Sequence, residues 1–166
     1  MNKLFCRHSF LFLAAAAFLL LSAGGTRLQA VEILQARAQY YPEKSFKRIS
    51  EYFTGVENMG RRAITRSRAE DRAGTYIVFK LDEKVAALPA DASVQVELID
   101  PADNLPKTFS MALPANRSKA REIFAGITGE DWPYDVGTRL LAWKVSLVDA
   151  AGGTLAEKGS FLWAMP

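Results

Sequence analysis

Histidine and cysteine are almost absent from this chain, and that absence narrows its chemistry. The 166 residues include one histidine, His8, and one cysteine, Cys6, both in an N-terminal stretch typical of a removable export signal. Without that stretch, the chain has no histidine base, no thiol nucleophile, no disulfide and none of the common zinc sites. The remainder also lacks the Gly-x-Ser-x-Gly, Ser-x-x-Lys and glycine-rich phosphate-binding motifs. We therefore predict that the protein is not an enzyme and has no cofactor or metal site.

The export signal shows three recognisable parts. Lys3 and Arg7 provide a basic start, residues 10–21 form a run of 12 apolar residues, and small residues follow at 22–25. A membrane-spanning helix needs about 20 apolar residues, so this run is too short to be an anchor. Cleavage could follow Ala23 or Ala30, and we favour Ala30 because a strand-like pattern begins at Val31. The prediction is a cleavable signal over 1–30 and export to the periplasm or the exterior, with no stable membrane insertion afterwards.

Little net charge remains once the signal is removed. Residues 1–30 hold three of the 21 Lys and Arg residues and no acid, so residues 31–166 balance 18 basic against 18 acidic side chains. Nucleic-acid binding requires a basic face that replaces phosphate counterions, so a neutral domain is a poor candidate. The length of residues 31–166 suits one domain with its own core.

Apolar and polar residues alternate with period two along most of the chain, which predicts strands. The turn residues Pro89, Pro101, Pro106 and Pro114 separate these segments. Residues 43–53 place Phe46, Ile49 and Phe53 at helical spacing before Gly55, although a strand over 49–54 is an alternative. The predicted strands cover residues 31–40, 61–67, 74–82, 93–100, 107–113, 120–128, 138–149 and 154–165.

The last two predicted strands form the clearest element. Residues 138–149 and 154–165 alternate on both sides of a turn, Asp149-Ala-Ala-Gly-Gly153, and predict a long antiparallel hairpin. Seven or eight strands without β-α-β alternation predict an all-β, two-layer antiparallel β-sandwich. The expected core contains Ile77, Phe79, Val94, Val96, Leu141, Trp143, Val145 and Phe161.

Residues 135–163 resemble the end of bacterial immunoglobulin-like or fibronectin-III-like modules. In those modules a glycine-led turn, here at Gly137, feeds the penultimate strand, and an Asp-x-x-Gly hairpin, here from Asp149, leads to the last one. The Cys pair of true immunoglobulin domains is missing. The resemblance implies an immunoglobulin-like sandwich but no catalytic residue, because such modules serve binding, spacing and assembly alike.

Two groups of residues are candidate contact sites. Trp132 and Tyr134 lie in the turn-rich segment Gly129–Asp135, where exposed aromatic rings could stack on sugars. Arg61, Arg62 and Arg66 begin a basic run that could bind an anionic partner. The alternative for the arginines is a solvated strand edge whose charges prevent aggregation. The acids of the Trp132 segment, Glu130, Asp131 and Asp135, fit a solvated loop better than a calcium site.

The expected function follows from these elements. The chain is expected to be an exported, non-catalytic β-sandwich domain with an interaction or structural role in a bacterial cell envelope. Its partner would be a protein or an envelope polymer, with no nucleic acid involved. A carbohydrate-binding module that uses Trp132 and Tyr134 is the alternative, and a hydrolase built on two carboxylates ranks third.

Overall fold

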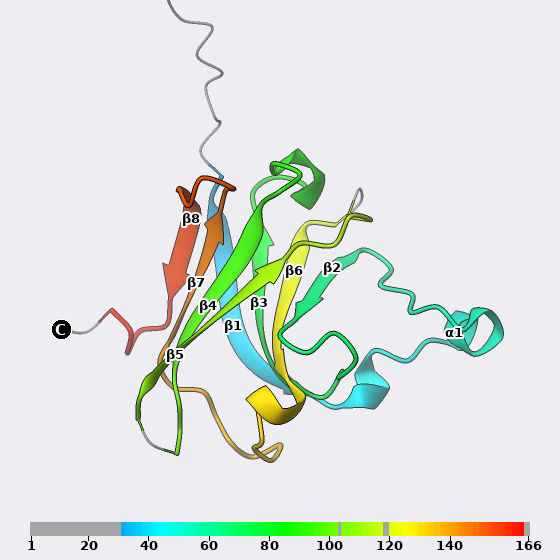
Figure 1. Cartoon of the computed structure of the whole chain (residues 1–166), viewed down its shortest axis with the longest axis horizontal. Coiled ribbons are helices and arrows are strands. Elements are labelled where there is room, and N and C mark those ends of the chain that lie inside the picture. The colour runs from blue at the N-terminus through cyan, green and yellow to red at the C-terminus, as the bar shows by residue number, and fades with distance from the viewer. Residues whose placement is uncertain (1–30, 103, 118–119, 165–166) are drawn as a thin grey trace, which may run out of the picture.

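The protein is a β-sandwich of two four-stranded sheets, seen in a computed structural model (Figure 1). The structure describes residues 31–102, 104–117 and 120–164, so the predicted signal over 1–30 lies outside the described residues. The first sheet, in the order β1-β3-β6-β2, consists of β1 (Ile33–Tyr41), β2 (Arg62–Arg66), β3 (Gly74–Leu81) and β6 (Glu122–Thr128). The second, in the order β5-β4-β7-β8, consists of β4 (Ser93–Ile99), β5 (Pro106–Ala112), β7 (Trp143–Val148) and β8 (Thr154–Gly159). The predicted all-β, two-layer sandwich of seven or eight strands is confirmed.

The strand pairing departs from the expectation in one place. Among the described residues all strand pairs are antiparallel except β2 and β6, which run parallel from Arg62 beside Glu122 to Arg66 beside Gly126. Strand β2 is thereby the edge of the first sheet, as the alternative for the arginine run anticipated.

Short helices occupy the connections between the strands. They are η1 (Glu43–Ser45), α1 (Ile49–Thr54), η2 (Val85–Ala87) and η3 (Gly129–Asp131). The helix expected near 43–53 is therefore present, in two pieces, and the alternative strand over 49–54 is wrong. No helix in the described part of the chain is long and apolar enough to span a membrane.

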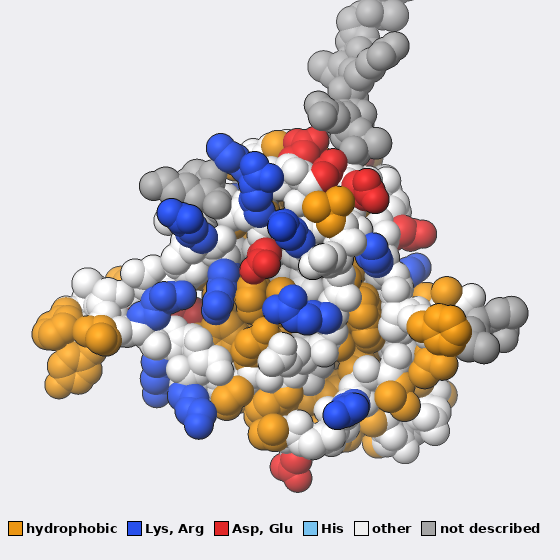
Figure 2. All heavy atoms as spheres, turned by 180° about the vertical axis from the view of Figure 1, so that it is seen from behind, with side chains coloured by type: hydrophobic (Ala, Val, Ile, Leu, Met, Phe, Trp, Pro, Cys, Tyr) orange, Lys and Arg blue, Asp and Glu red, His pale blue; other side chains and the backbone are white. Residues whose placement is uncertain are grey.

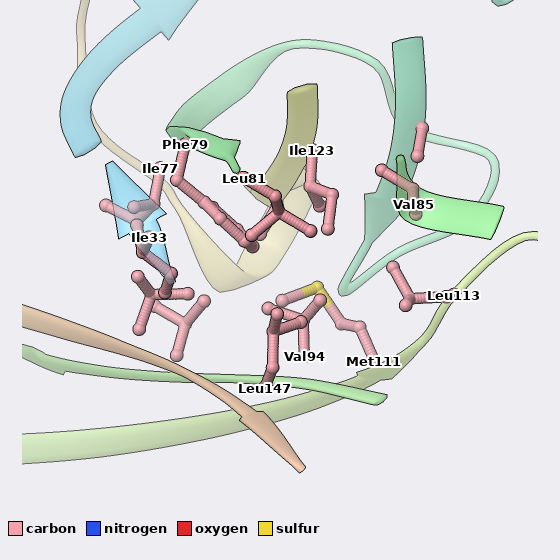
Figure 3. Close-up of a cluster of buried hydrophobic side chains, with 14 of the residues drawn as sticks. Ile33, Ile77, Phe79, Leu81, Val85, Val94, Met111, Leu113, Ile123 and Leu147 are labelled. Atoms are coloured by element: carbon pink, nitrogen blue, oxygen red, sulfur yellow. The ribbon is translucent and has the colours of Figure 1, made fainter. Parts of the chain in front are cut away.

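The main core lies between the two sheets (Figure 3). Alternate residues of β3 point into it and meet side chains of the second sheet. Six of the eight expected core residues are buried there, namely Ile77, Phe79, Val94, Val96, Trp143 and Val145. Figure 3 shows the contact between the sheets through Ile77, Phe79, Leu81 and Ile123 on one side and Val94, Met111 and Leu147 on the other.

The C-terminal hairpin is present but shorter than predicted. Strands β7 and β8 pair with Val145 opposite Lys158, and the carboxylate of Asp149 accepts hydrogen bonds from the Ala151 and Gly153 amides in the turn. Leu141 and Phe161, both expected in the core, are 65% and 80% exposed, so those two predictions are wrong. Leu141 precedes the first paired residue of β7, and Phe161 follows β8 in a turn, so neither obeys the alternation of the strands.

The outer face of the first sheet is buried as well. A second cluster, separate from the main core, contains Phe46, Ile64, Tyr76, Val78 and Phe124, with Tyr41 and Met59 at its border. Tyr76 and Val78 of β3, which alternate with its core residues, are therefore buried too. Phe46, which follows η1, comes from outside the sheet, so the segment 42–61 is held against this face.

Candidate interaction surface

Phe46 fixes the segment 42–61 to the first sheet. Its ring centroid lies 4.9 Å from that of Tyr76 and 5.8 Å from that of Tyr41, and its side chain is buried. The guanidinium carbon of Arg66 lies 5.0 Å from the Phe46 ring centroid, within the range of a cation–π contact. Aromatic pairs at such separations add to the stabilisation from burial alone. The position of the segment is therefore set by a packed contact.

An ion pair fixes the segment a second time. Arg66 donates two hydrogen bonds to the Glu57 carboxylate, at 2.8 and 2.6 Å, and a third to the Tyr76 hydroxyl at 2.9 Å. The Tyr76 hydroxyl in turn donates to the carbonyl of Arg72 at 2.8 Å. Burial opposes the charge of Arg66, but the hydrogen bonds to Glu57 and Tyr76 outweigh it and raise the Arg66 pKa. The hydrogen bond from Arg66 lowers the pKa of Glu57 in spite of burial.

Helix α1 is held through its polar side. Glu51 forms an ion pair with Arg72 at 2.5 Å, and both side chains are mostly buried. The Asn58 side-chain amide donates to the Ser50 hydroxyl at 3.0 Å. Gly55 ends the helix in the left-handed conformation (φ 66°), which glycine adopts without steric cost, and its amide donates to the Glu51 carbonyl. The Glu51 side of α1 is thus tied to Arg72, and the Asn58–Ser50 bond closes the turn within the segment.

The apolar side of α1 faces solvent instead. Ile49, Tyr52 and Phe53 are at positions i, i+3 and i+4, and they are 83%, 89% and 79% exposed. Val56, just past the end of the helix, is 68% exposed. We call these four residues the α1 tip. Figure 1 shows α1 standing out from the sandwich on the side of β2, and Figure 2 shows hydrophobic side chains gathered on that projection.

Basic residues precede and follow the α1 tip in the sequence. Lys44, Lys47, Arg48 and Arg61 are exposed, and we call them the basic flank. Lys47 pairs with Glu43 at 2.9 Å in an exposed i,i+4 pair. A methyl group added to Gly60 would lie 3.4 Å from the Arg48 Nη2, so the guanidinium of Arg48 lies beside the chain that leads to Arg61. Figure 2 shows Lys and Arg side chains on the surface next to the projection.

The three arginines expected to bind an anionic partner occupy different environments. Arg61 is exposed, whereas Arg62 is half-buried with its guanidinium carbon 4.8 Å from the Phe124 ring centroid. The side chain of Arg66 is 5% exposed and fully engaged with Glu57 and Tyr76. Arg62 and Arg66 alternate with core residues of β2, so they pack on the outer face. The structure therefore leaves Arg61 as the fully exposed member of the three.

The predicted aromatic loop is not an exposed platform. Trp132 is 4% exposed and belongs to the main core, so the expectation that it is exposed is wrong. Its ring meets that of Tyr134 edge-on at 4.9 Å. Helix η3 brings Trp132 back toward the sandwich, with its amide bonded to the Gly129 carbonyl. A buried indole offers no face for a sugar ring, and the carbohydrate-binding alternative loses the residue on which it depended.

Tyr134 and Asp100 form a lock between two loops. The Tyr134 hydroxyl and the Lys107 ammonium both donate to the buried carboxylate of Asp100, and the Ala102 amide donates at 2.8 Å. Burial would raise the pKa of Asp100, but these hydrogen bonds together lower it to about 2. Two of the three acids near Trp132 form ion pairs, since Arg68 contacts Glu130 at 3.5 Å and Asp131 at 3.2 Å. Within residues 31–102, 104–117 and 120–164, no three His, Cys, Asp or Glu side chains are grouped as a metal site would need.

Sequence reasoning overlooked the α1 tip because it placed Phe46, Ile49 and Phe53 together at the spacing of one helix face. Phe46 is buried, but Ile49 and Phe53 point outward. The helix is interrupted between them, because Arg48 has extended backbone between η1 and α1. One sequence signal could have identified the tip. The short helix carries three large apolar side chains but has no apolar partner segment.

Comparisons with known proteins add little to this picture. No protein-family model matches the chain, and no curated protein does either. Among solved structures, an immunoglobulin-like protein from Pseudomonas aeruginosa is similar over 81% of this chain and 97% of its own, at 13% identity and a TM-score of 0.33. That neighbour is of the class which residues 135–163 resemble. The likeness carries no functional argument, and the fold class rests on the two sheets described above.

Proposed function

We propose that this chain is an exported, non-catalytic β-sandwich domain of a bacterial cell envelope that acts by binding through the α1 tip. The observation that supports the proposal is the orientation of α1. Glu51 on its polar side is paired with Arg72, whereas Ile49, Tyr52 and Phe53 are at least 79% exposed. These three side chains contribute nothing to the core of their own domain.

Exposure of several large apolar side chains to water is unfavourable, and a binding role would account for it. Single exposed apolar residues are ordinary on protein surfaces, but contiguous apolar patches mark interaction sites in many soluble proteins. In the α1 tip, the Tyr52 and Phe53 rings contact each other edge-on with centroids 5.5 Å apart, so the exposed surface is contiguous. The network around Arg66 and Phe46 holds the segment in place before any partner arrives. Such preorganisation lowers the entropic cost of binding.

The test compares two matched variants in cells that express the full coding sequence. Phe53→Asp should release the protein from the envelope fraction, whereas Phe161→Asp should not. Both phenylalanines are equally exposed, at 79% and 80%, so neither change should lower the melting temperature by more than about 2 °C. Intact mass of the exported protein should show that it begins near Val31.

Two results would contradict the proposal. Equal envelope association of wild type and Phe53→Asp would show that the tip is not the contact surface. A mature protein that retains residues 10–21 would show that the chain is anchored by its N-terminus, since that apolar run would then remain.

A further inference from the structure

We propose that the α1 tip enters the interface of an anionic lipid bilayer, with the basic flank in contact with the headgroups. This inference rests on the proposed function and names the partner. The attachment is peripheral and reversible, with the four tip residues at the level of the headgroups and upper acyl chains. It differs from a spanning segment, in keeping with the expectation that no part of the mature chain stays inserted across a membrane.

The shape of the tip favours a bilayer over a protein partner. A stable protein interface involves about 20–30 residues on each side, whereas the tip offers four large apolar side chains on a narrow projection (Figures 1 and 2). A protein partner would need a matching groove, but a bilayer accepts a convex apolar projection without one. Phe and Ile suit the acyl boundary, and Tyr is enriched at the interface between membrane and water.

The charges around the tip favour an anionic surface. Within the described residues, Lys44, Arg48 and Arg61 form no ion pair. The three carboxylates of the same segment are neutralised, because Glu43 pairs with Lys47 of the basic flank, Glu51 with Arg72 and Glu57 with Arg66. The segment therefore presents unpaired cations beside its apolar tip. Basic residues next to an interfacial apolar surface strengthen binding to anionic lipids, each by about fivefold.

Local probes test the insertion. The only cysteine is Cys6, so Phe53→Cys in a Cys6→Ser background carries a single thiol for the fluorophore NBD, and Phe161→Cys is the matched control. Protein from the full coding sequence is mixed with vesicles of phosphatidylcholine alone or with about 30% phosphatidylglycerol. We expect a blue shift and a severalfold intensity gain at position 53 with the anionic vesicles, and little change at position 161.

Charge variants test the role of the basic flank. Lys44→Gln and Arg61→Gln should each weaken binding to the phosphatidylglycerol vesicles about fivefold, and raised salt should weaken it further. Lys84→Gln removes an exposed lysine outside the segment 42–61 and should leave the affinity unchanged. Equal affinities for all three variants would overturn the assignment of the basic flank.

The inference and the function it rests on can fail separately. An unchanged NBD spectrum at position 53 with anionic vesicles would overturn bilayer insertion. If Phe53→Asp still loses envelope association in cells, the contact surface stands and its partner is a protein. If Phe53→Asp keeps envelope association, the proposed function itself is wrong.

Discussion

Replacing Glu57 with glutamine should destabilise the domain through the guanidinium it leaves behind. Arg66 has a side chain that is 5% exposed, and two of its three hydrogen bonds go to the Glu57 carboxylate. Glutamine keeps the shape but removes the charge and one acceptor. Breaking a buried ion pair from one side costs about 3–5 kcal/mol. Glu57 is 17% exposed, so water can partly replace it, and we expect about 2–3 kcal/mol.

Thermal unfolding measures this effect. For a domain of this size, a loss of about 2–3 kcal/mol corresponds to a fall in Tm of roughly 8–12 °C. Glu43→Gln is the control, because its pair with Lys47 is exposed and should contribute little. The double variant Glu57→Gln/Arg66→Met removes both charges and should regain most of the lost Tm, since an apolar replacement leaves no buried charge unpaired.

The same pair predicts a pH dependence. The pKa of Glu57 is lowered in the folded state, so its stabilising contribution is complete above the ordinary value of 4.5 and is lost as the pH falls through the folded pKa. The Tm difference between wild type and Glu57→Gln should therefore shrink below about pH 4.5. The reasoning is refuted if the Glu57→Gln and Glu43→Gln variants have the same Tm at neutral pH.

Two further predictions concern the core and the loop lock. Trp143→Ala should lower the free energy of unfolding by about 3–5 kcal/mol, because the indole is buried. Phe161→Ala should change it by under about 0.5 kcal/mol, because that ring is exposed. Urea titration measures both, and similar losses would mean that Phe161 is packed. Asp100→Asn should lower Tm at neutral pH, and this deficit should narrow between about pH 4 and pH 2, because the folded pKa of about 2 lies below the ordinary 3.8. If the Tm deficit stays constant over that pH range, protonation of Asp100 does not contribute to the acid denaturation of the domain.

Local signals were sufficient to predict the strands from the sequence. Period-two alternation marked the segments that became β3, β4, β5 and β6. Every predicted end lies within two residues of the observed one. The turn at Asp149 was also readable, because two glycines and a short acidic side chain suffice to build it. Each of these features depends on residues close together in the chain.

The wrong predictions concern residues whose burial depends on parts of the chain that are distant in sequence. Leu141 and Phe161 continue the alternation past the last paired residues, and only the partner strand shows where pairing stops. Trp132 has turn neighbours on both sides, yet η3 directs it into the core. Arg66 looked like part of a solvated run because its partner, Glu57, lies nine positions away in the connection before β2. Residue type alone did not distinguish a solvated arginine from a buried one.

In the segment 42–66, the residues that hold the fold differ from those of the proposed contact surface. Phe46, Glu51, Glu57 and Arg66 hold the segment in place, and each has a partner in the domain. Ile49, Tyr52 and Phe53 have no such role, since each is at least 79% exposed. The proposed function therefore predicts that substitutions in the second group weaken envelope association at constant stability, whereas those in the first should lower stability and displace the tip as well.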